Sequence, residues 1–207
     1  MSDEAVALAA AVRRLMNVAV LTESDDLATA AEEVNAIADR LEAHGTREAM
    51  PWPDPESMRR GHRPFSPVIG DANPIAPPMR VRQCEDGSVI GEATMRPIHE
   101  GPPGVVHGGW VASLLDQLLG HANAAAGVGG FTAQLTVRYR RPTPYDVPLL
   151  LRARTDSVEG RTVTSSGEIV ADGVVTAEAS GVFKMPSPQR VAALQESLQS
   201  RTAAAGS

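Results

Sequence analysis

One long helical segment, flanked on both sides by strand-like segments, constrains the fold of this chain more than any other feature. Within residues 107–126 apolar side chains recur at the three- and four-residue spacing of an amphipathic helix, at Val111, Leu114, Leu115, Leu118, Leu119 and Ala122. Strand-like segments precede this helix at residues 79–84 and 88–95, joined by an Asp86-Gly87 turn. The sequence therefore predicts one helix that packs on a sheet.

Four more strands are predicted after the helix, at residues 131–140, 149–157, 162–171 and 174–185. The Asp172-Gly173 pair between the last two is typical of a tight hairpin turn. Two strands, one long helix and four strands form the element order of an α+β domain, in which a largely antiparallel sheet covers a single helix.

The 207 residues suffice for one such domain with additional segments. We divide the chain into a helical N-terminal extension at 1–45, a proline-rich linker or strap at 46–78, the main domain at 79–186 and a C-terminal tail at 187–207. In the extension, two helical patterns flank a break at residues 22–26, where Ser24 is a candidate cap of the second helix and Gly45 suits its end. The tail contains a short helical pattern after Pro188.

Composition excludes several classes of function. The net charge of −6 argues against broad binding of nucleic acid, while arginines that cluster between residues 138 and 161 favour a discrete anionic ligand. The single cysteine, Cys84, cannot form an internal disulfide and indicates a structural thiol in a reduced, cytoplasmic protein. No apolar run has the length of a membrane span, the first residues do not resemble a secretory signal, and the histidines lack metal-ligand spacing.

The start of the predicted helix is a candidate ligand site. A Gly-Pro-Pro-Gly loop at 101–104 precedes His107-Gly108-Gly109, at the point where the first helical N–H groups have no partner inside the helix. Glycines there allow a ligand oxygen to approach the backbone, as a polarised carbonyl or an oxyanion requires. The same sequence is also typical of an ordinary glycine-rich loop before a helix, with no ligand bound.

Asp116 is the second candidate, because it lies among leucines in the middle of the same helix. It is either a solvated residue at the edge of the apolar stripe or a partly desolvated carboxylate that acts as a base or a nucleophile. Gly108 and Asp116 are separated by about 12 Å along one helix. If both act on one carbonyl, Asp116 comes from another subunit, as in a two-fold dimer with antiparallel helices.

Three segments of this region resemble a known family. GPPGVVHGGWVASLLD at 101–116, FTAQLTVRYRRPTP at 131–144 and DSVEGRTV at 156–163 are similar to hotdog-fold acyl-CoA thioesterases of the 4-hydroxybenzoyl-CoA and phenylacetate-pathway type, and most similar to the branch with the same GPPG-x-x-HGG segment. The resemblance covers roughly residues 79–185. It implies a hotdog fold, one long central helix wrapped by an antiparallel sheet of about six strands. It also implies a homodimer that pairs two sheets edge to edge, or a homotetramer built as a dimer of dimers.

The resemblance also implies catalytic roles. It matches Asp116 to the catalytic carboxylate, Gly108 or the adjacent backbone to the amide that polarises the thioester carbonyl, and Thr132 to a helper beside the attacking water. His107 is the motif histidine, which positions the loop. Coenzyme A is part of the substrate, so no separate cofactor is implied.

The coenzyme A side of the substrate is matched to a second group of residues. Simple alternation along 131–140 puts Thr132, Arg138 and Arg140 on one strand face, and the forked donors of arginine suit phosphates. The candidate substrate-binding residues are Gly109, Arg138, Arg140, Arg161, Thr162, Val163 and Thr164, the last three through the strand backbone.

The predicted activity is hydrolysis of an acyl-CoA thioester to a free acid and coenzyme A. The alternative is a non-catalytic acyl-CoA-binding or regulatory protein on the same fold, which would not need Asp116. Whether Asp116 acts as a general base or as a nucleophile stays open. Few aromatic residues leave an aliphatic pocket, which favours fatty acyl groups over aromatic ones.

Overall fold

The computed structural model describes residues 3–45, 63–77, 79–187, 189–190 and 193. These residues form two compact units, which we describe separately. The first unit holds helix α1, Asp3–Ala19, together with the strand-rich domain. The second unit holds helix α2, Leu27–Glu42. The helix predicted in the C-terminal tail falls almost entirely outside the described residues.

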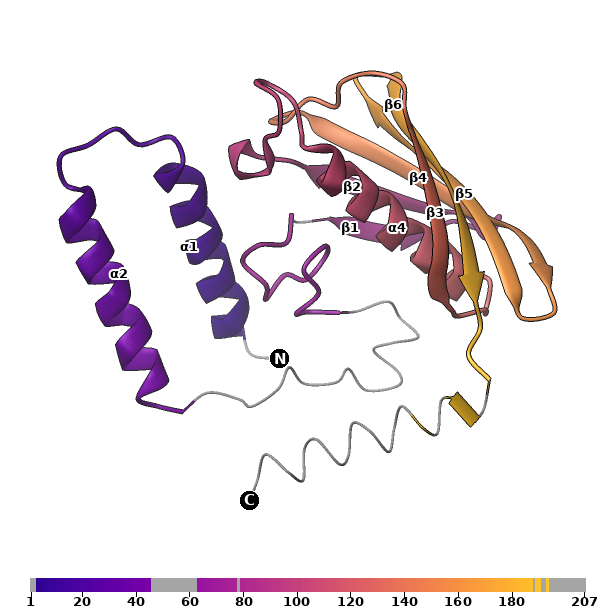
Figure 1. Ribbon diagram of the computed structural model, residues 1–207, viewed down its shortest axis with the longest axis horizontal. Helices are drawn as coiled ribbons and strands as arrows, with labels where there is room; N and C mark the ends of the chain where they lie inside the picture. The colour runs from indigo at the N-terminus through magenta and orange to yellow at the C-terminus, as the bar shows by residue number, and fades with distance from the viewer. Residues whose placement is uncertain (1–2, 46–62, 78, 188, 191–192, 194–207) are drawn as a thin grey trace. The chain divides into compact units, whose positions relative to one another are not determined.

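A six-stranded antiparallel sheet forms the body of the first unit (Figure 1). Its strands are β1 Arg80–Gln83, β2 Val89–Thr94, β3 Phe131–Tyr139, β4 Pro148–Glu159, β5 Thr162–Ala171 and β6 Val174–Lys184. They lie in the order β1-β2-β4-β5-β6-β3, so β1 and β3 are the two edges. The predicted α+β hotdog fold, with about six strands around one helix, is confirmed.

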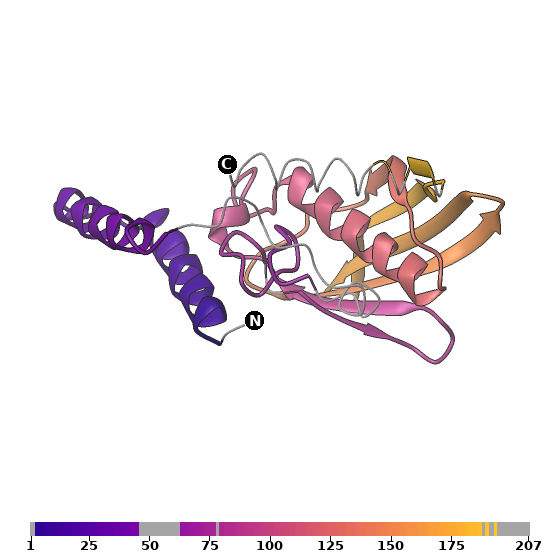
Figure 2. The same ribbon diagram turned by 90° about the horizontal axis from the view of Figure 1, so that it is seen from below.

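Helix α4, Gly108–Ala125, lies across one face of this sheet (Figure 2). Leu114, Leu115 and Leu118 on its inner stripe have no exposed surface, and Leu151 of β4 and Ile169 of β5 are equally buried beneath them. Burial of one such side chain contributes about 1.5–3 kcal/mol, so this stripe is what holds the helix on the sheet.

The contact between α4 and the sheet is close enough to require a residue without a side chain in β5. A Cβ atom added at Gly167 would lie 2.7 Å from the carbonyl oxygen of Arg152 and 3.3 Å from Cδ2 of Leu119. Glycine therefore occupies this position because the neighbouring strand and the helix fill the space.

The turns were predicted from sequence more reliably than the helix cap. Asp172 and Gly173 both have positive φ angles, 48° and 77°, as the predicted hairpin turn requires. Gly45 also has a positive φ of 86° after α2. The prediction that Ser24 caps α2 is wrong: Asp26 occupies the cap position without a side-chain bond, and the Ser24 hydroxyl accepts the Asp26 N–H at 3.1 Å.

Helix α1 is tied to the described part of the strap, residues 63–77. The guanidinium of Arg13 donates from Nε to the carbonyl oxygen of Ala76 and from Nη2 to that of Asn73, both at 2.9 Å. Ala9 of α1 is buried, and Val68 and Ile69 of the strap pack against the domain core. Helix α1 and the described part of the strap therefore belong to the first unit through specific contacts.

Candidate functional site

The first turn of α4 has one backbone donor without an internal partner. His107 is the N-cap residue, and its Nδ1 accepts the N–H of Gly109 at 3.0 Å. The N–H groups of Trp110 and Val111 donate to the carbonyl oxygen of His107. Within the described part of the chain, the Gly108 N–H has no hydrogen-bond partner. The predicted pair of glycine donors is therefore reduced to one, because the cap uses Gly109.

The loop before α4 is held in place by its own hydrogen bonds. The Gly101 N–H donates to the carbonyl of Val105 at 2.9 Å, and the Gly104 N–H donates to Oε1 of Glu100 at 2.6 Å. Gly104 has a φ of 78°, which favours glycine. The Glu100 carboxylate also raises the pKa of the nearby Tyr145 hydroxyl. The position of the Gly108 amide is thus fixed from the side of the loop.

Tyr139, at the end of β3, contacts the start of α4 directly. Its hydroxyl donates to the carbonyl oxygen of Gly108 at 2.9 Å, which orients the peptide group that follows the candidate amide. Sequence reasoning missed this residue, although alternation along the strand had placed Tyr139 on the face opposite Arg138 and Arg140. That face is the one turned to α4.

Asp116 and Thr132 meet at the other end of β3. The Thr132 hydroxyl donates to Oδ1 of Asp116 at 2.8 Å, and Asp116 is half-buried although leucines with no exposed surface lie on both sides of it in sequence. This places the carboxylate at the boundary between the core and the open edge of the sheet. A carboxylate fixed by one hydroxyl keeps acceptor capacity for a further ligand.

A register shift in β3 corrects the predicted arrangement of this strand. Thr132 pairs with Phe183 and Gln134 pairs with Val182, so an extra residue lies between the two pairs. After such a bulge the alternation of side chains changes phase. Thr132 therefore faces α4, whereas Arg138 lies on the opposite face, and the prediction that they share a strand face is wrong.

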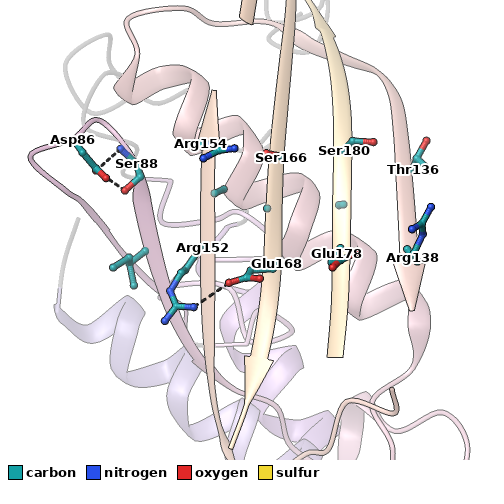
Figure 3. Close-up of a pocket in the computed structure, with 14 residues that line it drawn as sticks. Asp86, Ser88, Thr136, Arg138, Arg152, Arg154, Ser166, Glu168, Glu178 and Ser180 are labelled. Carbon is teal, nitrogen blue, oxygen red and sulfur yellow. Dashed lines mark hydrogen bonds and ion pairs between the residues drawn. The ribbon is translucent and has the colours of Figure 1, made fainter. Parts of the chain in front are cut away.

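On the face of the sheet turned away from α4, polar residues line a groove of about 620 Å³ (Figure 3). Its lining includes Arg138, Arg152 and Arg154, together with the hydroxyl residues Thr136, Ser166 and Ser180. Arg152 forms an ion pair with Glu168 at 2.9 Å, and Arg154 with Asp156 at 3.0 Å. Arg140 pairs with Glu178 at 2.7 Å. Arg138 has no ion-pair partner among the described residues.

Thr162, Val163 and Thr164 lie in β5, an interior strand of the sheet, whereas Arg161 lies in the turn before it and is exposed. β5 pairs with β4 on one side and with β6 on the other, so its backbone takes part in the sheet. That the backbone of these three residues also binds the coenzyme A arm stays a prediction. The Val163 side chain has no exposed surface. The Thr162 hydroxyl accepts from Lys184, the Thr164 hydroxyl contacts Ser157 at 2.8 Å, and Arg161 donates to the carbonyl of Met185.

A six-stranded antiparallel sheet on one long helix, with an open amide at the helix start and a carboxylate halfway along it, defines a protein of the hotdog class. Comparison with known proteins agrees. The family model described as the thioesterase superfamily matches residues 103–178. The crystal structure of a thioesterase superfamily protein superposes with a TM-score of 0.78 and 41% identity, covering 86% of this chain and 94% of that one. The chain belongs to the thioesterase superfamily.

Curated relatives match over a shorter stretch. Acyl-coenzyme A thioesterase THEM4 of Xenopus laevis is 35% identical over 89 residues, which are 42% of this chain and 40% of that protein. Acyl-coenzyme A thioesterase THEM5 of Homo sapiens is 33% identical over 86 residues, 41% of this chain and 35% of that protein. The chain thus matches less than half the length of these relatives. In the described part of the chain, no helix is both long and apolar enough to cross a bilayer.

Proposed function

We propose that this protein hydrolyses acyl-coenzyme A thioesters to a carboxylic acid and coenzyme A. The observation that carries the proposal is the division of the site along β3. At one end of the strand, Tyr139 binds the carbonyl of Gly108, the residue with the open amide, and at the other end Thr132 binds Asp116. The names and the partial similarity of THEM4 and THEM5 support an acyl-CoA substrate.

The Gly108 N–H is the donor proposed for the thioester carbonyl oxygen. It lies at the positive end of α4, where partial negative charge is stabilised. When water adds to the carbonyl carbon, the oxygen becomes an oxyanion and its hydrogen bond to a backbone donor strengthens. The tetrahedral intermediate then breaks its carbon–sulfur bond and releases the coenzyme A thiolate, which takes up a proton.

Asp116 is proposed to activate the water. Its Oδ1 accepts the Thr132 hydroxyl at 2.8 Å, which fixes the carboxylate and leaves Oδ2 to accept a proton from water. Direct attack by the carboxylate would instead form a mixed anhydride, which water then hydrolyses. A single turnover in ¹⁸O-water distinguishes the two routes, because only the anhydride route can leave ¹⁸O in the Asp116 side chain.

The two halves of the site are proposed to meet across a homodimer. Gly108 and Asp116 of one chain lie about 12 Å apart on α4 and cannot both contact one carbonyl group. β3 is an edge strand, and its apolar side chains Phe131 and Tyr139 are 61% and 54% exposed. Antiparallel pairing of β3 with its copy would cover this edge and bring each Gly108 towards Asp116 of the partner subunit. A dimer of dimers remains compatible with this pairing.

Arg138 is the first candidate for the phosphates of coenzyme A, because its side chain is exposed and has no ion-pair partner in the described residues. Arg140 is paired with Glu178, and Arg161 donates to the Met185 carbonyl. To bind the phosphates of coenzyme A, each of these arginines would have to give up its present partner. Thr162 and Thr164 are proposed to act through their hydroxyls, and Gly109 and Val163 through shape alone. A cytoplasmic location stays a prediction that rests on the single thiol of Cys84.

A hybrid dimer tests both the activity and the shared site. One chain carries Asp116→Asn and the other carries Gly108→Pro, with different affinity tags so that the hybrid can be isolated. If the site is shared, one of its two sites receives both changes and the other receives neither, so the hybrid regains about half of the wild-type rate of coenzyme A release. Both parent homodimers serve as inactive controls. A hybrid as inactive as its parents refutes the shared site, and a wild-type protein that releases no coenzyme A from acetyl to long-chain substrates refutes the function.

A further inference from the structure

A chain of contacts outside the matched family segment leads from helix α1 to the start of α4. It begins at Arg13, whose two hydrogen bonds reach the carbonyl oxygens of Asn73 and Ala76 in the strap. Ala76 has no exposed surface, so its carbonyl depends on a protein donor. The adjacent Arg14 is exposed and makes no contact of this kind in the described residues.

The next residue in this series of contacts is His99, at the end of the short helix η1, Pro97–His99. The residue is 1% exposed, and its Nδ1 accepts the N–H of Arg96 at 3.0 Å. The Nε2 atom is buried and makes no hydrogen bond of ordinary geometry. Helix α1 is in contact with η1. The backbone of Ile75, the residue before Ala76 in the strap, interacts with the His99 ring, and burial lowers the pKa of His99. The strap segment that Arg13 holds therefore lies against His99.

His99 contacts the first turn of α4, residues 107–110, at two points. Its carbonyl oxygen accepts the N–H of His107 at 2.8 Å. Its ring lies edge-on to the ring of Trp110, with centroids 4.8 Å apart at an angle of 84°. His107 and Trp110 flank the Gly108–Gly109 pair, so a displacement of His99 would be passed to the peptide that carries the Gly108 amide.

We propose that Arg13 is a positioning residue for the thioesterase site. By fixing two strap carbonyls it holds α1 and the strap against His99, which sets the position of His107 and Trp110 and thereby the direction of the Gly108 N–H. The positioning role rests on the proposed function, whereas the mechanical link between Arg13 and the turn does not. Helix α1 then contributes to catalysis by positioning the Gly108 N–H.

The effect expected on turnover is moderate and selective. Misplacement of a catalytic group by about 1 Å can cost up to about 100-fold in rate. Arg13→Gln removes the guanidinium group with its two donors but keeps a polar side chain, and we expect kcat to fall about tenfold. KM for the acyl-CoA should change less than about twofold, because Arg13 does not touch the proposed coenzyme A residues. Arg14→Gln, the matched control on the next position of α1, should leave both constants unchanged.

Two readouts follow the link without any substrate. In the full-length protein with Trp52→Phe, the fluorescence of Trp110 reports its contact with His99. Hydrogen exchange measured by mass spectrometry reports the backbone of residues 99–110. Arg13→Gln should shift the emission and speed exchange in this segment, while exchange in the β5–β6 hairpin and all Arg14→Gln results stay at wild-type values. Arg13→Lys keeps the charge but lacks the planar guanidinium with its two parallel donors, so its emission and exchange should lie between those of wild type and Arg13→Gln.

The outcomes separate the two proposals. Unchanged emission and exchange in Arg13→Gln refute the link, and changed emission and exchange with unchanged kcat refute the positioning role. If Arg13→Gln fails to fold, Arg13→Lys decides by the same criteria. A wild-type protein that releases no coenzyme A refutes the enzymatic proposal, and the emission and exchange measurements then still test the link from Arg13 to the turn.

Discussion

The open amide of Gly108 can be removed without removing the helix it begins. Proline has no N–H and is favoured at the first position of a helix, which is where Gly108 lies. His107 before it has φ −57° and ψ 134°, the extended conformation that a residue before proline prefers. Gly108→Pro therefore deletes one proposed catalytic donor while it leaves the helix start compatible with the fold.

The matched control is Gly108→Ala, which adds a Cβ but keeps the N–H. A Cβ at this position would lie 3.3 Å from the Tyr139 hydroxyl and 3.4 Å from two of its ring carbons, a tight contact that a small shift of the exposed tyrosine can relieve. We expect alanine to lower kcat by no more than about threefold. Proline adds the same Cβ and a ring whose Cδ takes the place of the N–H hydrogen, so the difference between the two variants reports the loss of the donor at this position.

The loss of one donor from an oxyanion site typically costs about 100- to 1,000-fold in kcat, or roughly 2.7–4 kcal/mol. We expect this loss for Gly108→Pro, measured as coenzyme A thiol release from a series of acyl-CoAs. Circular dichroism and the unfolding midpoint in urea should stay close to those of the alanine variant. Proline and alanine variants with equal kcat would show that the Gly108 N–H does not bind the carbonyl oxygen.

Two further predictions concern the outer groove of the sheet and the buried His99. Arg138→Gln should raise KM for acyl-CoA about three- to tenfold at low ionic strength, and less in about 0.5 M salt, because exposed charges are screened. The control is Arg154→Gln, since the Arg154 guanidinium is already paired with Asp156, and equal effects on KM would contradict the assignment of Arg138. Burial lowers the pKa of His99 from 6.5, so the unfolded chain binds its proton more tightly, and the free energy of unfolding should fall as pH drops below 6.5. His99→Gln should flatten this dependence in urea titrations, and an unchanged slope would rule His99 out as its source.

The sequence predicted the elements of this fold because their patterns are local. The leucine spacing of 107–126 marks α4 to within one or two residues, and alternation between turns located all six strands. The Asp86-Gly87 and Asp172-Gly173 turns could be predicted from residue type alone, because few residues adopt positive φ angles. The distance between Gly108 and Asp116 also followed from helix geometry, and with it the hypothesis of a shared site.

The tertiary structure decided which side chains meet. Pairing of β3 with β6 places a bulge after Thr132, and this bulge turns Thr132 towards Asp116 while Arg138 faces the outer groove. Simple alternation cannot anticipate such a shift, because it depends on the partner strand about 50 residues away. The contacts of Arg13 with the strap span 60 and 63 residues, and no local pattern encodes them.

The sequence by itself therefore determined a helix on an antiparallel sheet, an amide-bearing turn and a carboxylate too far along the same helix to serve it. Only the tertiary structure decided that Thr132 binds Asp116 and that Tyr139 binds the carbonyl of Gly108. The physical reason is that secondary structure follows from the periodicity of neighbouring residues. The hydrogen bonds of a site depend on three-dimensional positions that distant segments set together.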